Sequence, residues 1–243
     1  ASHTGRADSG PLPLGMQVAD IAGGSLHGVV GLLAAVVQRQ ATGVGQAVDI
    51  SMTDCAFSLN AMAGAAYLAA GEEPGMEGNA LNGGSFYDYY QTRDGQWFSV
   101  GSLEPQFMQQ LCAALGRSEL AKWGLRPDKQ GELKNEIRIE FEKRDAAQWR
   151  ELFASMDACV EPMLSFAEAV EHPQIRAREL VLEVPREGKS AQRQIASPIK
   201  FSEGLPAPRH IGAALGAHNA EVLEGLGYSS AQIAEMKAAK VIG

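Results

Sequence analysis

A long apolar run dominates the N-terminal part of the chain. Residues 21–40 are apolar on nearly every side of a helix and follow directly after Asp20. A helix that is apolar all round is usually buried, so we expect a buried helix here. Beyond it, apolar residues alternate with polar ones over 46–52, which predicts a strand. A second apolar helix is expected over 55–70, capped by Thr53-Asp54 just before it.

The clearest β pattern lies further along the chain. Aromatic and other strand-favouring residues fill 86–92 and 96–101, and Asp94-Gly95 lies between the two segments. An Asp-Gly pair between two such runs is typical of a two-residue turn in which both residues have positive φ. The pattern therefore predicts a β-hairpin closed by a type I′ turn.

The remaining pattern alternates helices, short strands and loops. A helix is expected from Pro105 to the residue before Gly116, since proline is favoured at the first helical position and glycine just past the last. The other expected elements are a long glycine-rich loop (71–84), a charged helical stretch (127–156), two short helices (165–171 and 173–179), two pairing strands (181–184 and 193–196) and two closing helices (217–225 and 230–239). The order indicates a mixed α and β chain with no complete βαβ series.

The composition fits a protein with a sizeable core and an acidic surface. The 243 residues are 45% hydrophobic, and 21 basic against 29 acidic residues give a net charge of −8. This balance argues against a binder of nucleic acid or of an anionic membrane. The run 21–37 is interrupted by glycines and polar residues, so we interpret it as a buried helix and not as a membrane span. The three separated cysteines (Cys55, Cys112 and Cys159) favour a reducing, cytoplasmic compartment over a disulfide framework or zinc site.

The first candidate for chemistry is the start of the apolar helix. Asp20 stands at that predicted start and is followed by Gly23 and Gly24. Glycines let a ligand approach the backbone closely, and free N–H groups at a helix start favour negative charge. Such a place could combine a carboxylate with groups that stabilise an enolate or oxyanion. The alternative is that Asp20 is an ordinary helix cap.

Two further places combine polar residues with a loop. Glu104 lies where a strand is expected to end and a helix to begin, which is a common position for functional groups. It equally fits a carboxylate that complements the helix dipole. Gly83 and Gly84 lead into the hairpin, either as a mobile flap over a site or as a flexible entry to a strand. The five histidines have no metal-ligand spacing, so no metal site is expected.

A series of motifs, taken in chain order, points to a known family. The motifs are Asp20-x-x-Gly23-Gly24, Arg39-Gln40-x-Thr42-Gly43-x-Gly45-Gln46, Asp49-x-Ser51-Met52, Asp157-Ala158-Cys159-Val160-Glu161-Pro162 and Glu168-Ala169-x-x-His172-Pro173. In this order they resemble the class III CoA-transferase and α-methylacyl-CoA racemase superfamily over essentially the whole chain. The resemblance implies an α/β fold, with part of a Rossmann-like large domain over 1–70 and 186–243 and a smaller α+β domain over 71–185.

The superfamily contains two chemistries that use the same aspartate differently. In the transferases the residue that matches Asp20 is a nucleophile that forms a mixed anhydride, and in the racemase branch it is one of two acid/base groups. The segment Glu104-Pro105-Gln106-Phe107 resembles the racemase branch, where the matching glutamate hydrogen-bonds the catalytic histidine. The resemblance thus implies Asp20 and Glu104 as catalytic residues. The substrate-binding residues that it implies are Gly23, Gly24, Met52, Leu81, Gly83, Gly84 and Tyr87.

The racemase branch implies epimerisation of 2-methyl-branched acyl-CoA thioesters by proton transfer through an enolate. Coenzyme A is then part of the substrate, with no metal or redox cofactor. The implied partners are the acyl-CoA and a second copy in an interlocked homodimer, with no nucleic acid and no membrane. The alternatives are a CoA-transferase with Asp20 as nucleophile, and a non-catalytic fragment or partner subunit. The family's catalytic histidine and most CoA contacts are expected N-terminal to Ala1, so the chain resembles the C-terminal two-thirds of such an enzyme.

Overall fold

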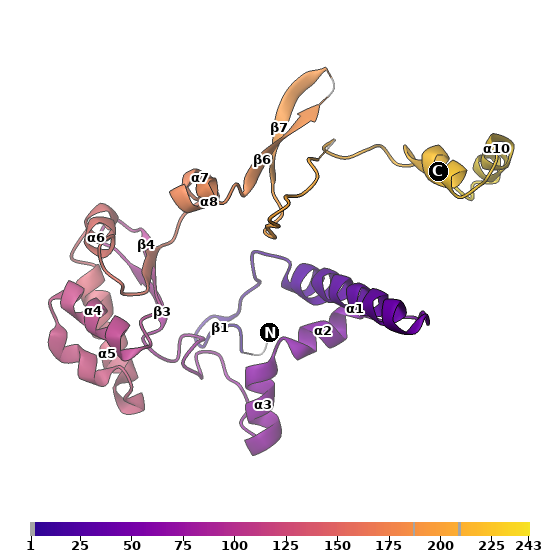
Figure 1. Ribbon diagram of the computed structural model, residues 1–243. Helices are drawn as coiled ribbons and strands as arrows, with labels where there is room; N and C mark the ends of the chain where they lie inside the picture. The colour runs from indigo at the N-terminus through magenta and orange to yellow at the C-terminus, as the bar shows by residue number, and fades with distance from the viewer. Residues whose placement is uncertain (1–2, 187, 209) are drawn as a thin grey trace. The chain divides into compact units, whose positions relative to one another are not determined.

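The chain folds into two compact units, one ending at Met163 and the other beginning at Leu164. The computed structural model describes residues 3–186, 188–208 and 210–243, and Figure 1 traces them. The first unit contains every residue expected at the site and has a helical N-terminal part and a small sheet with its own helices. The expected domain boundaries near 70 and 185 stay a prediction.

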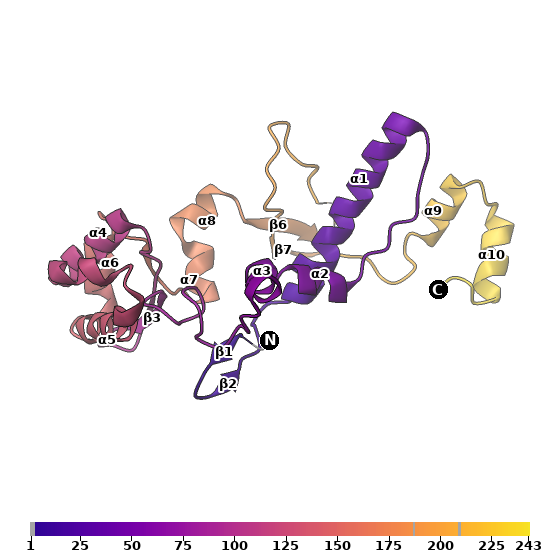
Figure 2. The same cartoon turned by 90° about the horizontal axis from the view of Figure 1, so that it is seen from below.

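The N-terminal part of the first unit is a short hairpin followed by helices. The hairpin strands pair antiparallel, as Figure 2 shows. The π-helix runs without a break into the first α-helix, and α2 packs against it. These elements are β1 (Gly5–Arg6), β2 (Gly10–Pro11), η1 (Val18–Ser25), α1 (Leu26–Thr42), α2 (Met52–Ser58) and α3 (Ala61–Ala70).

The expectation that the long apolar helix is buried was wrong. No residue of α1 is buried, and Val30 and Val37 are more than 60% exposed. A helix is buried only where other elements cover it, and a uniformly apolar sequence does not specify which element that is. The helix Val18–Thr42 also has the length and composition of a membrane span, so the interpretation against a membrane span stays a prediction. Apolar core helices meet the same criterion.

The predicted strand over 46–52 does not form. Its apolar residues contact α1 instead, since a Cβ placed on Gly31 would lie 2.6 Å from Ile50 Cδ1 and 3.1 Å from Val48 Cγ1. The absence of a side chain at Gly31 therefore lets this segment approach the helix closely. An alternating pattern shows that one side of a segment is covered, but it does not show whether a sheet or a helix covers it.

The expected apolar helix over 55–70 is split into α2 and α3. Asn60 Nδ2 donates a hydrogen bond to the Ala56 carbonyl at 2.7 Å, in competition with the backbone N–H that would continue the helix. The cap also differs from the prediction. Ser51 Oγ accepts a hydrogen bond from the Asp54 N–H at 3.1 Å, so Ser51 is the cap in place of Thr53-Asp54.

A three-stranded antiparallel sheet in the order β3-β4-β5 forms the centre of the remaining part of the first unit. Helices gather beside it in Figure 1, and together they enclose an aromatic and aliphatic core. The elements are β3 (Asp88–Gln91), β4 (Trp97–Val100), α4 (Pro105–Leu115), η2 (Ser118–Trp123), η3 (Pro127–Lys129), α5 (Gln130–Phe141), α6 (Ala146–Phe153) and β5 (Val160–Pro162). The largest fully buried side chains here are Phe86, Phe98, Leu111, Leu133, Ile137, Phe141 and Trp149.

The predicted hairpin is confirmed, but its turn is of another type. The Thr92 N–H donates to the Gln96 carbonyl at 2.8 Å, which leaves a loop over 93–95, and within this loop the Gly95 N–H donates to the Thr92 carbonyl at 2.9 Å. Gly95 has a φ of +81°, whereas Asp94 is not among the residues with positive φ, so the turn is not type I′. The Asp94 carboxylate instead accepts hydrogen bonds from Thr92 Oγ1 at 2.5 Å and the Ala146 N–H at 3.0 Å. It thereby joins the turn to the start of α6.

The second unit confirms most of the local predictions for its segment. Gly188, with a φ of +66°, lies in the turn of its hairpin, and Ser229 with Gln232 forms the expected capping box. The elements are α7 (Phe166–Glu171), α8 (Pro173–Ala177), β6 (Val181–Arg186), β7 (Lys189–Ile195), α9 (Asn219–Gly225) and α10 (Ser230–Ala238).

Candidate functional site

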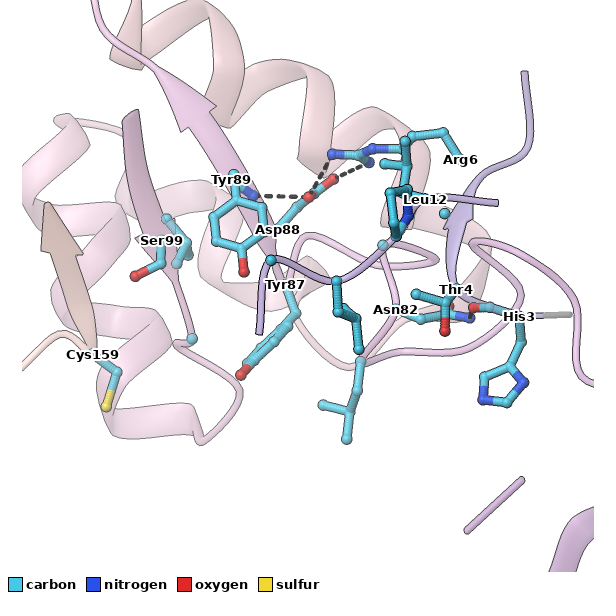
Figure 3. Close-up of a pocket in the computed structure, with 18 residues that line it drawn as sticks. His3, Thr4, Arg6, Leu12, Asn82, Tyr87, Asp88, Tyr89, Ser99 and Cys159 are labelled. Atoms are coloured by element: carbon cyan, nitrogen blue, oxygen red, sulfur yellow. Dashed lines mark hydrogen bonds and ion pairs between the residues drawn. The ribbon is translucent and has the colours of Figure 1, made fainter. Parts of the chain in front are cut away.

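Two neighbouring cavities in the first unit bring together residues that are far apart in the sequence. The first has a volume of about 620 Å³ and includes Leu81, Gly83 and Tyr87 among its lining residues (Figure 3). The second has a volume of about 710 Å³ and includes Asp20. Thr4 and the loop 12–15 line both cavities. Four of the residues predicted at the site therefore lie around two spaces that share one wall.

Asp20 lies within η1 and is not the residue that caps it. The cap position is Gln17, so the interpretation of Asp20 as an ordinary helix cap was wrong. Asp20 is exposed, and its backbone carbonyl accepts a hydrogen bond from Ser25 Oγ at 3.0 Å. Wide π-helical turns occur often at functional sites. The local fold thus presents the Asp20 carboxylate to the second cavity, where a substrate could reach it.

Gly23 and Gly24 serve helix packing in this structure. Both lie well inside the continuous helical segment, so the expectation that they offer free N–H groups at a helix start was wrong. Gly23 is buried against Cys55, and a Cβ on Gly24 would lie 3.2 Å from Met52 Cγ. The two glycines let α2 pack closely on η1, and this packing brings Met52 beside the segment that contains Asp20.

Glu104 occupies the cap position before α4 without acting as a cap. Its side chain makes no capping hydrogen bond and is exposed, and it is not among the residues that line either cavity. The charge of the Glu104 carboxylate nevertheless affects the pKa of Cys159, which lines the first cavity. Burial raises the pKa of the Cys159 thiol, and the negative charges of Asp157 and Glu104 raise it further.

The loop that contains Gly83 and Gly84 is folded back on itself. The Gly84 N–H donates to the Asn79 carbonyl at 3.0 Å, and a Cβ on Gly84 would lie 2.5 Å from the Glu77 carbonyl oxygen. Asn82 Nδ2 donates to the Gly75 carbonyl at 2.9 Å. These contacts make the segment a hydrogen-bonded wall of the first cavity, which differs from both the flap and the flexible entry expected from the sequence.

Four charged residues around this wall were missed in the sequence. Asp88 accepts hydrogen bonds from Arg6 Nη1 at 2.8 Å and Nη2 at 3.0 Å, which Figure 3 draws. Lys134 Nζ lies 2.6 Å from Asp88 Oδ2, and Arg6 also pairs with Glu77 at 2.8 Å. The Asp88 side chain is only 6% exposed. A buried carboxylate is stable only when it is paired and hydrogen-bonded, as it is here.

One signal in the sequence could have revealed Asp88. Strand residues two apart face the same side, so Phe86, Asp88 and Tyr90 share a face. Phe86 and Tyr90 are almost fully buried, and Asp88 is 9% exposed. A carboxylate on the buried face of an aromatic strand requires positively charged partners. The sequence alone could not identify those partners, because Arg6 is 82 positions away.

The surroundings of Asp88 predict a specific response to acid. Burial by itself raises the pKa of Asp88, but hydrogen bonds from Arg6, Lys134 and the Tyr89 N–H outweigh it and lower that pKa. The carboxylate therefore stabilises the fold above its unfolded pKa of about 3.9, and this contribution is lost as the pH falls through the lower folded value. Asp88→Asn is expected to cost about 2–3 kcal/mol at pH 7, because both cations lose their buried partner.

Urea denaturation between pH 7 and pH 2.5 measures this effect. The wild-type chain should lose stability more steeply below about pH 4 than the Asp88→Asn variant does. Asp128→Asn is the matched control, since Asp128 pairs with Arg126 at 2.6 Å on the surface with its side chain 59% exposed. A variant at Asp88 with the wild-type stability at pH 7 would contradict the prediction.

Two more polar residues line the first cavity, Cys159 and His3. The raised pKa of the Cys159 thiol keeps it protonated near neutral pH, which does not favour a nucleophilic role. His3 Nδ1 is buried and has no hydrogen-bond partner among the residues that the structure describes. Within the same residues, no three His, Cys, Asp or Glu side chains are grouped so that they could hold a metal ion.

Comparisons with known proteins give consistent matches. A model of CoA-transferase family III matches residues 1–219. Human α-methylacyl-CoA racemase is 31% identical over 245 residues, which cover 99% of this chain and 63% of the relative. Succinyl-CoA:mesaconate CoA-transferase of Haloarcula hispanica is 32% identical over 233 residues, which cover 92% of this chain and 57% of the relative. The chain thus spans about three fifths of the length of these curated relatives.

A solved structure supports the same fold. The crystal structure of a CaiB/BaiF family protein from Brucella suis matches with a TM-score of 0.73 at 23% identity. The match covers 93% of this chain and 59% of that chain. The α/β fold class expected from the motifs is therefore confirmed.

Proposed function

Because this chain belongs to CoA-transferase family III, we propose that it is the greater part of an enzyme that epimerises the α-carbon of 2-methylacyl-CoA thioesters. The observation that carries the proposal is the exposed Asp20 carboxylate in a cavity that shares a wall with the one lined by Leu81, Gly83 and Tyr87. The similarity to α-methylacyl-CoA racemases over 99% of the chain supports the reaction.

The reaction requires a base, an acid and stabilisation of the charge that develops. Asp20 takes the C2 proton, and the electron pair of the C–H bond moves onto the thioester oxygen to form an enolate. A second acid returns a proton to the opposite face of C2. The motif resemblance gives this role to a histidine that Glu104 orients. In this proposal Tyr87 and Gly83 border the thioester, while Met52 and Leu81 border the acyl chain.

The test has two arms. The first uses the 243-residue chain by itself. The second adds the part of human α-methylacyl-CoA racemase that this chain does not match. Enantiopure 2-methylacyl-CoA is incubated in D₂O without any carboxylate acceptor, and NMR follows loss of the C2 proton. Chiral analysis follows inversion separately, because one base can exchange the proton without inverting the centre. Exchange with inversion supports the proposal. A folded chain with no exchange in either arm contradicts it and favours a non-catalytic role.

A CoA-transferase is the second candidate, since a succinyl-CoA:mesaconate CoA-transferase is equally similar over 92% of the chain. In that reaction the Asp20 carboxylate attacks the thioester carbonyl, coenzyme A leaves as a thiolate, and a mixed anhydride forms on Asp20. Trapping of an acyl or CoA adduct on Asp20 by mass spectrometry, together with transfer to an added carboxylate, would favour this reaction over epimerisation.

A further inference from the structure

Two cations and two carboxylates from four separate segments surround Gly83. Lys134 from α5 donates a hydrogen bond to the Gly83 carbonyl at 2.8 Å, and it also pairs with Asp88 from β3 at 2.6 Å. Arg6 from β1 pairs with both Asp88 and Glu77 at 2.8 Å. We call these residues the wall cluster: Arg6, Glu77, Asp88 and Lys134. Its two positive and two negative charges give a net charge of zero.

Gly83 lines the first cavity together with Arg6 and Asp88 of the wall cluster. Gly83 has a φ of +94°, and a Cβ at this position would lie 3.2 Å from Glu77 Cγ and 3.3 Å from Arg6 Nη1. Only glycine therefore combines this backbone conformation with so close an approach of the charged side chains. The residues before it, Leu81 and Asn82, line the cavity together with Gly83.

Lys134 acts on the cavity through the backbone of Gly83. This side chain is not among the residues that line the cavity, yet it holds the carbonyl of one that is. The Gly83 carbonyl is thus hydrogen-bonded to a charged group on the α5 side of the wall. On the other side of the cluster, Glu77 accepts a hydrogen bond from the Ala7 N–H at 2.9 Å, which ties the β1–β2 hairpin to the same loop.

Paired charges of this kind are a weak source of net stability. Replacing such a group by apolar residues of similar size is often neutral, because desolvation offsets the attraction between the charges. The directional hydrogen bonds, in contrast, define one arrangement of the four segments. A role in fixing the shape of the cavity therefore explains the cluster better than a role in stability alone.

We propose that the wall cluster is a set of positioning residues that holds the segment 81–83 in the shape that accepts the acyl group of the thioester. This inference rests on the proposed function, because it takes the cavity to be the acyl-CoA site. Its central contact is the hydrogen bond from Lys134 to the Gly83 carbonyl. Loss of that contact releases the wall and weakens binding, while the core of the first unit stays folded.

The test compares Lys134→Met with Lys134→Arg and with Lys143→Met. Lys143 pairs with buried Glu140 at 2.6 Å and is not among the described residues that line the first cavity, so it is the matched control. Hydrogen–deuterium exchange over 75–84 reports the wall, and exchange over 105–153 reports the fold in the same sample. Lys134→Met should speed exchange over 75–84 about tenfold, the size expected for one lost hydrogen bond to a charged group.

Binding of 2-methylacyl-CoA by calorimetry gives the second readout. Lys134→Met should raise the dissociation constant about tenfold, Lys134→Arg should stay near wild type, and Lys143→Met should change neither exchange over 75–84 nor binding. In catalysis the effect should fall on KM more than on kcat, because the positioning residues act on binding. Glu77→Gln, which changes the more exposed of the two carboxylates in the cluster, repeats the exchange test if Lys134→Met does not fold.

Unchanged exchange over 75–84 in Lys134→Met, or an equal increase in Lys143→Met, overturns the inference. Failure of the wild-type chain to bind acyl-CoA would instead overturn the proposed function, and with it the ligand part of this inference. The exchange comparison would then still decide whether the wall cluster holds the segment 81–83.

Discussion

Asp20→Asn is expected to reduce deuterium exchange at C2 of 2-methylacyl-CoA by about 10²–10⁴-fold, the usual contribution of a positioned acid or base. The substitution keeps the size of the side chain but removes its ability to take a proton. Because Asp20 is exposed and its side chain has no hydrogen bond or ion pair within the part of the chain that the structure describes, thermal stability should change little. Asp20→Glu should retain part of the activity, since its carboxylate is displaced by one methylene group.

Asp54→Asn is the control for the loss of an exposed carboxylate in the same region. Asp54 lies in the first turn of α2, next to η1, and lines neither cavity. The Asp54→Asn variant should exchange the C2 proton of 2-methylacyl-CoA at the wild-type rate. Exchange in Asp20→Asn within tenfold of the wild type would remove Asp20 from the reaction and would leave both the racemase and the transferase proposals without their central residue.

Phe141→Ala is expected to lower the free energy of unfolding of the first unit by about 3–5 kcal/mol, as large aromatic truncations in a core do. Phe141 is fully buried and contacts four aromatic rings. Its ring lies 4.9 Å from Trp149 and 5.5 Å from Tyr90, centroid to centroid. The loss combines hydrophobic transfer, the remaining cavity and the aromatic contacts.

Urea denaturation followed by tryptophan fluorescence measures this loss, because all three tryptophans belong to the first unit. Phe57→Ala is the control, since Phe57 is 76% exposed and its truncation should cost no more than about 0.5 kcal/mol. The free energy of unfolding of Phe141→Leu should lie between those of Phe141→Ala and Phe57→Ala. A midpoint for Phe141→Ala equal to that of Phe57→Ala would contradict the assignment of Phe141 to the centre of the core.

The same core supports the candidate site. Phe141 stacks on Tyr90, and β3, which contains Tyr90, also contains Asp88. Asp88 in turn binds Arg6 and Lys134, whose contacts hold the wall of the first cavity. We therefore expect core variants to weaken acyl-CoA binding only to the extent that they unfold the sheet, whereas wall-cluster variants weaken it in a folded chain.

Much of the local structure could be predicted from the residues alone. Pro105 begins α4 and Gly116, with a φ of +73°, follows its end, because these preferences depend on a few neighbouring atoms. Ser229 and Gln232 form their capping box for the same reason. The sequence predicted the hairpin but not its turn type, because the Asp94 carboxylate accepts a hydrogen bond from the Ala146 N–H, which is 52 positions away.

The candidate site, too, could be predicted from the sequence only in part. Motifs spread over the chain were enough to indicate the family and to single out Asp20, Leu81, Gly83 and Tyr87, all of which line the two cavities. They were not enough to describe Gly23 and Gly24 correctly, because the helix begins before Asp20 and not after it. The motifs also missed Lys134, which reaches the wall of the site from α5, a helix that contains none of these motifs.

By itself, the sequence determined the short-range elements and the family, because helix caps, proline and glycine preferences and ordered motifs are properties of neighbouring residues. Only the tertiary structure decided which surfaces are covered and which charges meet. The apolar helix α1 is exposed because coverage depends on other elements, and the alternating segment at 46–52 contacts a helix because its pattern fits either partner. Arg6, Asp88 and Lys134 meet at Gly83 because the fold brings four distant segments together, and no local pattern carries that information.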